Sequence, residues 1–383
     1  MFDAATVNFL KTVDTPFYYY DLSLLRRTLD LYTAELNKYK FKAHYALKAN
    51  ANNRILKLIK SYDLGADCVS GNEVSLALNQ GFDPKSIVYA GVGKTDKEIE
   101  TAIAGDIFSV NCESIPEIEV VNQIAGRMNK TAPVSLRINP DIDPHTHEYI
   151  STGRSKDKFG ISYRVFDELI DIINSCTNIK LVGLHFHVGS QITDMKVFEL
   201  LADRVNEISL DFERKGLNIE TINLGGGLGV DYTEPNEYPI PDFSAYFSIF
   251  NKKLKRRSCQ QIHFEPGRAI VAQCGSLISK VLYVKIENGD KIVILDAGMN
   301  DLIRPALYQA THKVENLTSL FGNLQEYDVV GPVCESSDKF GQRLLLPETM
   351  RGDIFALRSA GAYGQVMAMR YNQRDIAKDF YSE

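Results

Sequence analysis

Eight short apolar segments alternate with longer amphipathic segments through the first two thirds of the chain. The short segments lie at about 43–47, 66–69, 87–90, 107–110, 134–138, 181–186, 220–224 and 261–265. Between them, apolar residues recur at helical spacing at 53–63, 72–80, 96–104, 166–175 and 197–215, with Gly216 as a C-cap. This number of strands and helices predicts a (β/α)8 barrel, with an open doubly wound sheet as the alternative.

The pattern changes after Glu265. Four further strands are predicted with few helical stretches between them, at 269–286, 291–295, 329–334 and 353–357, and Asn288-Gly289 is a strong hairpin signal. These strands predict a second, mostly antiparallel β domain. The strand at 15–20 has no partner in the barrel, so we expect it to pair with this domain. The predicted division is therefore a barrel of residues 21–265 and a β domain made of residues 1–20 with 266–383.

The composition excludes several classes of protein. The 383 residues carry a net charge of −6, so no basic face indicates nucleic acid as a partner. No apolar run approaches the roughly 18 residues of a membrane span. Residues 1–16 do not resemble a signal peptide. The six cysteines show neither a CxxC pair nor metal-ligand spacing, so we expect no metal site and a reducing, cytoplasmic location.

Polar residues and glycines stand at the carboxyl ends of the predicted barrel strands. They are Lys48, Asp67, Ser70 and Arg137, followed by the sequences HFHVGSQ (185–191), LGGGLG (224–229) and FEPGR (264–268). In (β/α)8 barrels, the active site is built at this end of the strands. The distribution therefore predicts one active site that draws on most of the strands.

Lys48 follows an apolar strand and is the candidate nucleophile. A lysine that is desolvated at such a position loses its proton readily, and only the neutral amine attacks a carbonyl to form a Schiff base. A strand-end lysine that reaches into solvent is the alternative, and the lysine alone does not decide between the two.

Three further features suit a cofactor that carries phosphate and an aromatic ring. Gly225–Gly227, after the seventh strand, could bind phosphate through backbone N–H groups near a helix N-terminus, with Ser190 adding a hydroxyl; a plain tight turn is the alternative. His185 and His187 should face opposite sides of their strand, which makes a poor metal pair. His187 is the better placed to lie against a ring.

Glu265 ends the eighth strand. A carboxylate that faces the ring nitrogen of pyridoxal phosphate keeps this nitrogen protonated, and the ring then withdraws electrons strongly. Decarboxylation at an amino-acid α-carbon needs such an electron sink. A salt bridge to Arg268, three residues along the chain, is an alternative that does not exclude this role.

Eight motifs occur in an order that resembles a known family. They are YALKAN, ADCVSGNE, HFHVGSQ, LGGGLG, FEPGR, DAGMNDLIRPALY, GPVCESSD and GAYG, and the resemblance runs from about residue 15 to residue 372. Together they resemble the alanine-racemase-fold (group III) pyridoxal-phosphate decarboxylases, and most closely the diaminopimelate decarboxylase family. The segments HEYISTG, NDLIRPALY and GPVCES carry the narrower resemblance.

The resemblance implies a binding site for pyridoxal 5′-phosphate. Its residues would be Lys48, Asp67, Arg137, His187, Ser190, Gly225, Gly226, Gly227, Glu265, Pro266, Gly267, Arg268 and Tyr363. Among these, Lys48 would form the Schiff base, His187 would stack on the ring and Glu265 would pair with the ring nitrogen. Asp67 and Arg137 would lie near the lysine and the ring hydroxyl.

The resemblance also implies how substrate would be bound. Arg268, Arg304 and Tyr308 would bind substrate carboxylates, and Tyr363 would contact both cofactor and substrate. Cys334 would donate a proton and Glu335 would bind a substrate ammonium group. In this family these last two residues reach the active site of the other subunit, which implies a homodimer.

The implied activity is decarboxylation of meso-2,6-diaminopimelate to L-lysine and CO2, the last step of lysine biosynthesis. Related decarboxylases that act on ornithine, arginine or carboxynorspermidine are the alternative. An amino-acid racemase is disfavoured, because racemases use a weaker electron sink than Glu265 provides. A non-catalytic relative is disfavoured too, because Lys48, Glu265 and Cys334 are all present. The polar segment 141–160 is expected to close over substrate as a lid.

Overall fold

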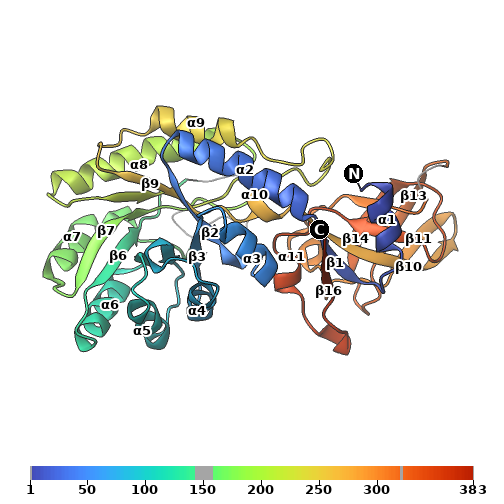
Figure 1. Ribbon diagram of the computed structural model, residues 1–383, viewed down its shortest axis with the longest axis horizontal. Helices are drawn as coiled ribbons and strands as arrows, with labels where there is room; N and C mark the ends of the chain where they lie inside the picture. The colour runs from blue at the N-terminus through green and yellow to red at the C-terminus, as the bar shows by residue number, and fades with distance from the viewer. Residues whose placement is uncertain (1, 143–157, 320–321, 383) are drawn as a thin grey trace. The chain divides into compact units, whose positions relative to one another are not determined.

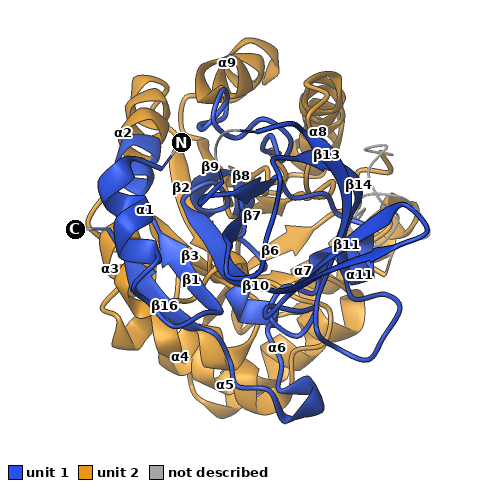
Figure 2. Ribbon diagram, turned by 90° about the vertical axis from the view of Figure 1, so that its right-hand side faces the viewer, with its two compact units in different colours: residues 1–28, 230–241, 268–383 blue, residues 29–229, 242–267 orange. Residues whose placement is uncertain are grey.

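The structure is a computed structural model that describes residues 2–142, 158–319 and 322–382. The chain forms two compact units, which Figure 2 shows in different colours. Unit 1 contains residues 1–28, 230–241 and 268–383, and unit 2 contains residues 29–229 and 242–267. The predicted lid segment lies mostly outside the described residues.

Unit 2 is built on a closed barrel of eight parallel strands. The strands are β2 (Lys42–Ala46), β3 (Gly65–Cys68), β4 (Ile87–Tyr89), β5 (Ser109–Cys112), β6 (Ala132–Arg137), β7 (Ile179–His185), β8 (Thr221–Asn223) and β9 (Gln261–Phe264). The barrel closes where β9 pairs with β2, with Lys42 opposite His263. Each of the eight predicted barrel strands is confirmed, and the closure excludes the open sheet.

Helices follow the strands and surround the barrel (Figure 1). They are α3 (Asn53–Lys60), α4 (Gly71–Asn79), α5 (Asp96–Ala104), α6 (Ile115–Arg127), α7 (Phe166–Ser175), α8 (Lys196–Arg214) and α9 (Phe243–Lys253), while α2 (Leu22–Lys38) precedes β2. Local sequence sets their ends. Ser70 caps α4, and Thr95 forms a capping box with Glu98 at the start of α5. Gly216 follows α8 with φ of +82°, as predicted.

Unit 1 contains a mostly antiparallel eight-stranded sheet. Its strands are β1 (Phe17–Tyr20), β10 (Gly275–Glu287), β11 (Asp290–Leu295), β12 (Val314–Asn316), β13 (Gln325–Val330), β14 (Lys339–Leu346), β15 (Ile354–Leu357) and β16 (Lys378–Tyr381). β1 pairs antiparallel with β10 and parallel with β16, which confirms that the first strand belongs to this sheet. Two short helices, α1 (Ala4–Leu10) and α11 (Arg304–Tyr308), complete the unit.

Two predicted strands in unit 1 have wrong boundaries. The run 269–286 begins as helix α10 (Arg268–Val271), and the strand starts only at Gly275, where a Cβ would lie 2.4 Å from the Cα of Gly361. The strand predicted at 329–334 ends at Val330. Beyond it the chain turns around the buried carboxylate of Asp338, which accepts the N–H group of Val333 at 2.7 Å. Tertiary contacts override β propensity at both places.

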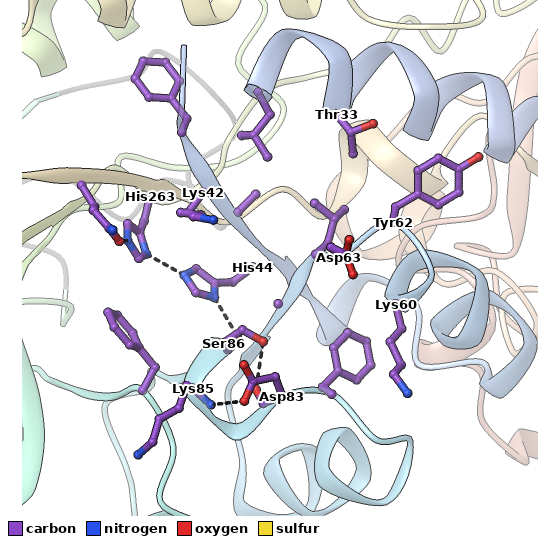
Figure 3. Close-up of a pocket in the computed structure, with 18 of the residues that line it drawn as sticks. Thr33, Lys42, His44, Lys60, Tyr62, Asp63, Asp83, Lys85, Ser86 and His263 are labelled. Atoms are coloured by element: carbon purple, nitrogen blue, oxygen red, sulfur yellow. Dashed lines mark hydrogen bonds between the residues drawn. The ribbon is translucent and has the colours of Figure 1, made fainter. Parts of the chain in front are cut away.

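A cavity of about 600 Å³ lies at the amino-terminal ends of the barrel strands in unit 2, opposite to the end where the predicted site residues stand. Figure 3 shows two buried imidazoles beside it in a hydrogen-bonded chain. His44 Nδ1 lies 2.8 Å from the carbonyl oxygen of Ser86, so it donates, and His44 Nε2 lies 2.8 Å from His263 Nδ1 and therefore accepts. Both rings stack nearly parallel to Phe108. Burial favours the neutral form of both histidines, and the hydrogen-bonded chain fits two neutral rings.

The histidine pair predicts that stability falls at acid pH. Burial lowers the pKa of both His44 and His263 below the ordinary value near 6.5. Stability is therefore full above pH 6.5, and below it the unfolded chain takes up protons that the folded pair does not. The unfolding free energy should fall by up to about 1.4 kcal/mol per pH unit for each such histidine. Urea denaturation between pH 7.5 and 5.5 measures this slope, and His263→Gln should reduce it; an unchanged slope in the variant would contradict the assignment.

No helix in the part of the chain that the structure describes is both long and apolar enough to cross a membrane.

Candidate active site

A cavity of about 410 Å³ opens at the carboxyl ends of the barrel strands. Five of the predicted site residues line it: Lys48, Asp67, Arg137, His187 and Glu265. They come from five different strands or from the segments that follow them, so only the closed barrel brings them together. His185, Tyr89, Phe159 and the segment Gly91–Lys94 complete much of the wall.

Lys48 lies in a single 3-10 turn, Leu47–Ala49, directly after β2. Its neighbours Leu47 and Ala49 are buried, whereas Lys48 itself is exposed and lines the cavity. The expectation of a desolvated lysine at the strand end is therefore wrong in detail, because β2 ends at Ala46, two residues before Lys48. Burial raises the pKa of Asp67 and that of Glu73, and the positive charge of Lys48 offsets part of this rise. The same charge adds to the lowering of the pKa of His187 by burial.

Glu265 is held by two buried side chains. His185 Nε2 lies 2.9 Å from one carboxylate oxygen, and Asn223 Nδ2 donates to the other at 2.7 Å. Burial by itself would raise the pKa of Glu265, but His185, His187 and Lys48 together lower it well below its ordinary value. Glu265 therefore remains an anion in the cavity wall, and its salt-bridge partner is His185.

His185 and His187 both line the cavity, so the expectation that they face opposite sides is wrong. Strand β7 ends at His185, and the alternation of side chains ends with it. His187 Nδ1 accepts the N–H group of Gly226 at 3.2 Å, which leaves Nε2 to carry the proton of the neutral ring. Burial and the charges of Lys48 and Arg137 lower the pKa of His187 well below its ordinary value. The ring is neutral at physiological pH.

Gly225–Gly227 pack too closely for side chains. A Cβ on Gly225 would lie 2.4 Å from the carbonyl oxygen of Phe186, and one on Gly226 would lie 2.2 Å from that of Glu265. Gly225 and Gly227 also have φ of +68° and +110°. The predicted helix N-terminus is absent in this described stretch, since the next helix, α9, begins only at Phe243. The run therefore offers backbone without side chains, but no helix dipole.

Two buried polar atoms in the cavity wall have no hydrogen-bond partner in the described part of the chain. They are Asp67 Oδ1 and His185 Nδ1. Asp67 is 1 % exposed, and burial together with the charge of Glu265 raises its pKa well above the ordinary value. Buried polar groups are rarely left without partners, so each such group calls for an explanation. A polar ligand in the cavity would provide one.

Sequence reasoning missed several residues that shape this site. His185 was assigned no role, Asn223 was not considered, and neither were Glu73 and Glu113, which accept hydrogen bonds from the N–H groups of Val69 and Gly91. One signal exists for Asn223, because barrel register places it opposite His185. Glu73 carried a signal too, since it ends the motif ADCVSGNE and stands three residues after the helix cap Ser70. Glu113 gave no signal beyond being an acidic residue after a strand.

Unit 1 contains a buried pair of arginines. Arg268 donates to the hydroxyl of Tyr232 at 2.6 Å, and the guanidinium of Arg304 lies over the ring of Tyr232, 4.6 Å from its centroid. Arg304 also donates to His312 Nε2 at 2.7 Å, while His312 Nδ1 donates to the carbonyl of Arg358. Burial and the charge of Arg304 lower the pKa of His312 to about 3, so this histidine is a neutral acceptor.

The remaining predicted residues are placed as follows. Tyr363 stacks on Arg268, with 4.9 Å between guanidinium and ring centroid, and its φ of +56° is rare for a bulky residue. Cys334 and Glu335 are exposed, and Glu335 accepts a 2.5 Å hydrogen bond from Tyr371. Tyr308 is half-buried at the end of α11. Within unit 2, Ser190 precedes a bridge that joins Ile192 to Leu228, beside the glycine run.

Known proteins resemble this chain along most of its length. A family model described as "Pyridoxal-dependent decarboxylase, pyridoxal binding domain" matches residues 22–272. The chain is 53 % identical to the diaminopimelate decarboxylase of Bacteroides thetaiotaomicron over 374 residues, 97 % of each chain. It is 41 % identical to that of Zymomonas mobilis, covering 95 % of this chain and 87 % of the relative.

Solved structures agree. The crystal structure of diaminopimelate decarboxylase from Helicobacter pylori complexed with L-lysine superimposes with a TM-score of 0.92 at 38 % identity, covering 98 % of this chain and 93 % of that one. An arginine decarboxylase from Paramecium bursaria Chlorella virus shares the fold at 20 % identity, with a TM-score of 0.88. With 53 % identity over 97 % of its residues, the chain belongs to the diaminopimelate decarboxylase family of pyridoxal-dependent decarboxylases.

Proposed function

We propose that this protein is an enzyme that decarboxylates meso-2,6-diaminopimelate to L-lysine and CO2 with pyridoxal 5′-phosphate as cofactor. The observation that carries the proposal is the cavity that Lys48 and Glu265 line together. The cavity brings together the amine of Lys48 and the ionised carboxylate of Glu265. The hydrogen bond from Gly226 to His187 connects the glycine run to the same cavity. The family membership supports the same activity and the same cofactor.

The residues of unit 2 fit this cofactor. Lys48 supplies the amine for the Schiff base, and the unpartnered oxygen of Asp67 supplies a polar contact. Gly225–Gly227 would receive the phosphate together with Ser190, and backbone at Pro266 and Gly267 would complete that side. When bound, the cofactor withdraws electrons from the substrate α-carbon after CO2 has left.

Three side chains would set the electrostatics around the cofactor ring. Glu265, kept anionic by His185, would hold a proton at the ring nitrogen. His187 is neutral and presents a flat ring, so it would stack without adding positive charge. Arg137 lines the same cavity. Glu265 would therefore place its negative charge beside the ring nitrogen and favour protonation of that nitrogen. The ring withdraws electrons most strongly when this nitrogen is protonated.

Unit 1 would bind the substrate. Arg268 and Arg304 are suited to carboxylates, because a guanidinium can donate two parallel hydrogen bonds. Tyr308 and Tyr363 would add contacts, and Glu335 would bind the ammonium group at the end that does not react. Cys334 would return a proton to the α-carbon. A diacid substrate with a second ammonium group fits this set better than ornithine or arginine does.

An assay of CO2 release tests the substrate. The purified enzyme, loaded with pyridoxal 5′-phosphate, is given meso-diaminopimelate, L-ornithine, L-arginine or carboxynorspermidine under identical conditions. We expect kcat/KM for diaminopimelate to exceed each of the others by at least about a hundredfold, since an unpaired buried arginine disfavours substrates that lack the distal carboxylate. Equal or faster release from a diamine precursor would assign the chain to that activity instead.

We further propose a homodimer, located in the cytoplasm, in which Cys334 and Glu335 serve the active site of the other subunit. Both residues are exposed on unit 1, and the cysteines in the described structure are unpaired, which suits a reducing compartment. The functional domains would be residues 21–265, and 1–20 with 266–383.

Mixing two inactive variants tests the shared site. Lys48→Ala and Cys334→Ala chains, unfolded and refolded together, would form mixed dimers that hold one intact site. About a quarter of wild-type activity should return, because half of the dimers are mixed and each has one of two sites. Each variant refolded alone is the control. Activity that stays at the level of these controls would show that Cys334 serves its own subunit or is not needed.

A further inference from the structure

The carboxylate of Glu113 joins three segments in unit 2. Glu113 directly follows β5, and its side chain is 2 % exposed. One carboxylate oxygen accepts hydrogen bonds from Arg137 and from the N–H group of Gly91, both at 2.9 Å. The other accepts the N–H group of Gly160 at 3.1 Å. The partners belong to the ends of β4 and β6 and to residue 160, which lies between β6 and β7 in the chain.

These partners belong to two parts of the cavity wall. Gly91 opens the segment Gly91–Lys94, which lines the cavity after β4. Arg137 lines it at the end of β6, and Phe159 stacks on the guanidinium with 4.8 Å between charge and ring centroid. Gly160 follows Phe159 directly in the chain. The position of one carboxylate therefore determines where both parts of the wall stand.

The backbone positions that contact Glu113 at residues 91 and 160 favour glycine. Gly91 and Gly160 have φ of +120° and +75°, and a Cβ on Gly160 would lie 3.0 Å from the backbone nitrogen of Asn139. Lys94, which is 1 % exposed, donates to the carbonyl of Gly91 at 2.7 Å. Glu113 thus binds the N–H group of Gly91 and Lys94 binds its carbonyl. The conformation at Gly91 thus depends on two charged side chains, Glu113 and Lys94.

The negative charge of Glu113 serves as the counter-charge of Arg137. The guanidinium of Arg137 is 7 % exposed, and a buried cation without a counter-charge is strongly unfavourable. Burial by itself would raise the pKa of Glu113, but Arg137 and Lys94 lower it below its ordinary value, so the carboxylate is ionised. Glu113 thereby supplies the counter-charge of Arg137.

We propose that Glu113 is a positioning residue for the cofactor: it holds the guanidinium of Arg137 and the segments at Gly91 and Phe159 in the arrangement that binds pyridoxal 5′-phosphate. Glu113 itself does not line the cavity and acts through Arg137 and the two segments. The inference rests on the proposed cofactor site and adds a residue that the family motifs in this sequence do not include.

Glu113→Gln tests the inference, with cofactor affinity measured by equilibrium dialysis against pyridoxal 5′-phosphate. The variant keeps the shape of the side chain but removes the charge and one acceptor. We expect the cofactor Kd to rise by at least about tenfold, since hydrogen bonds to charged groups are worth roughly that factor or more. At saturating cofactor, kcat should recover to within about threefold of wild type. Glu113→Asp keeps the charge but has a shorter side chain, so its cofactor Kd should lie between that of the wild type and that of Glu113→Gln.

Two comparisons separate positioning from a general loss of stability. Glu315→Gln breaks a partly buried arginine–glutamate pair in unit 1, where Arg358 donates to Glu315 at 2.8 Å, and it should lower Tm without changing the cofactor Kd. Combining Glu113→Gln with Arg137→Gln should raise Kd little more than Arg137→Gln alone. A wild-type Kd in both Glu113 variants, or an equal rise in Glu315→Gln, would overturn the inference. Failure of the wild-type chain to bind the cofactor would instead refute the proposed function.

Discussion

Replacing Lys48 with alanine should lower kcat by at least about a thousandfold, the largest effect expected of any substitution in this chain. Lys48 is the lysine that lines the cavity beside Glu265 and His187, so its loss removes the amine that would bind the cofactor aldehyde. The visible absorbance of lysine-bound cofactor should disappear as well. CO2 release and absorbance spectra of wild-type and variant enzyme measure the two effects.

Lys42→Ala is the matched control. Lys42 belongs to the same strand, β2, but lies at its opposite end and is exposed beside the second cavity. It should leave both the absorbance and kcat unchanged, because the strand keeps its pairing with β9. If Lys48→Ala retained turnover and absorbance, the central assignment of the site would be lost.

Glu265→Gln should lower kcat by about a hundredfold to a thousandfold while cofactor remains bound. The amide keeps the shape of the side chain, and it can still contact His185 and Asn223. It cannot keep a proton at the cofactor ring nitrogen, because its negative charge is gone. Stopped-flow measurement of CO2 release, with the absorbance of bound cofactor as reference, separates a catalytic defect from loss of cofactor.

Glu265→Asp provides the comparison for Glu265→Gln. It retains the charge but is shorter, so it should be less impaired than the amide. Glu315→Gln, which removes a partly buried carboxylate of unit 1, controls for stability alone. A kcat within about threefold of wild type in Glu265→Gln would show that the carboxylate is not part of the electron sink.

The barrel could be predicted from sequence because its strands are buried on both sides. Such strands are short apolar runs, and the helices between them carry their own caps, such as Ser70 and Thr95. Both signals are local. In unit 1 the local signals fail at residues 269–274, where Gly361 from a distant part of the chain limits the backbone path. They also fail at residues 331–334, where the chain turns around the buried carboxylate of Asp338.

The candidate site was predicted in part for the same reason. Lys48, Asp67, Arg137, His187 and Glu265 follow strands, so the barrel rule places them at one end, and the structure brings them to one cavity. The orientation of the histidines was wrong, because alternation holds only within a strand and β7 ends at His185.

The sequence by itself determined the order of strands and helices, the residues at the strand ends and the family motifs, because these depend on neighbours in the chain. Only the tertiary structure decided how those residues work together. The pairing of Glu265 with His185 and Asn223, and that of Glu113 with Arg137, Gly91 and Gly160, join positions far apart in sequence. Closure of the barrel brings these groups within hydrogen-bond distance, and the neighbours that it brings there keep both carboxylates ionised against the effect of burial.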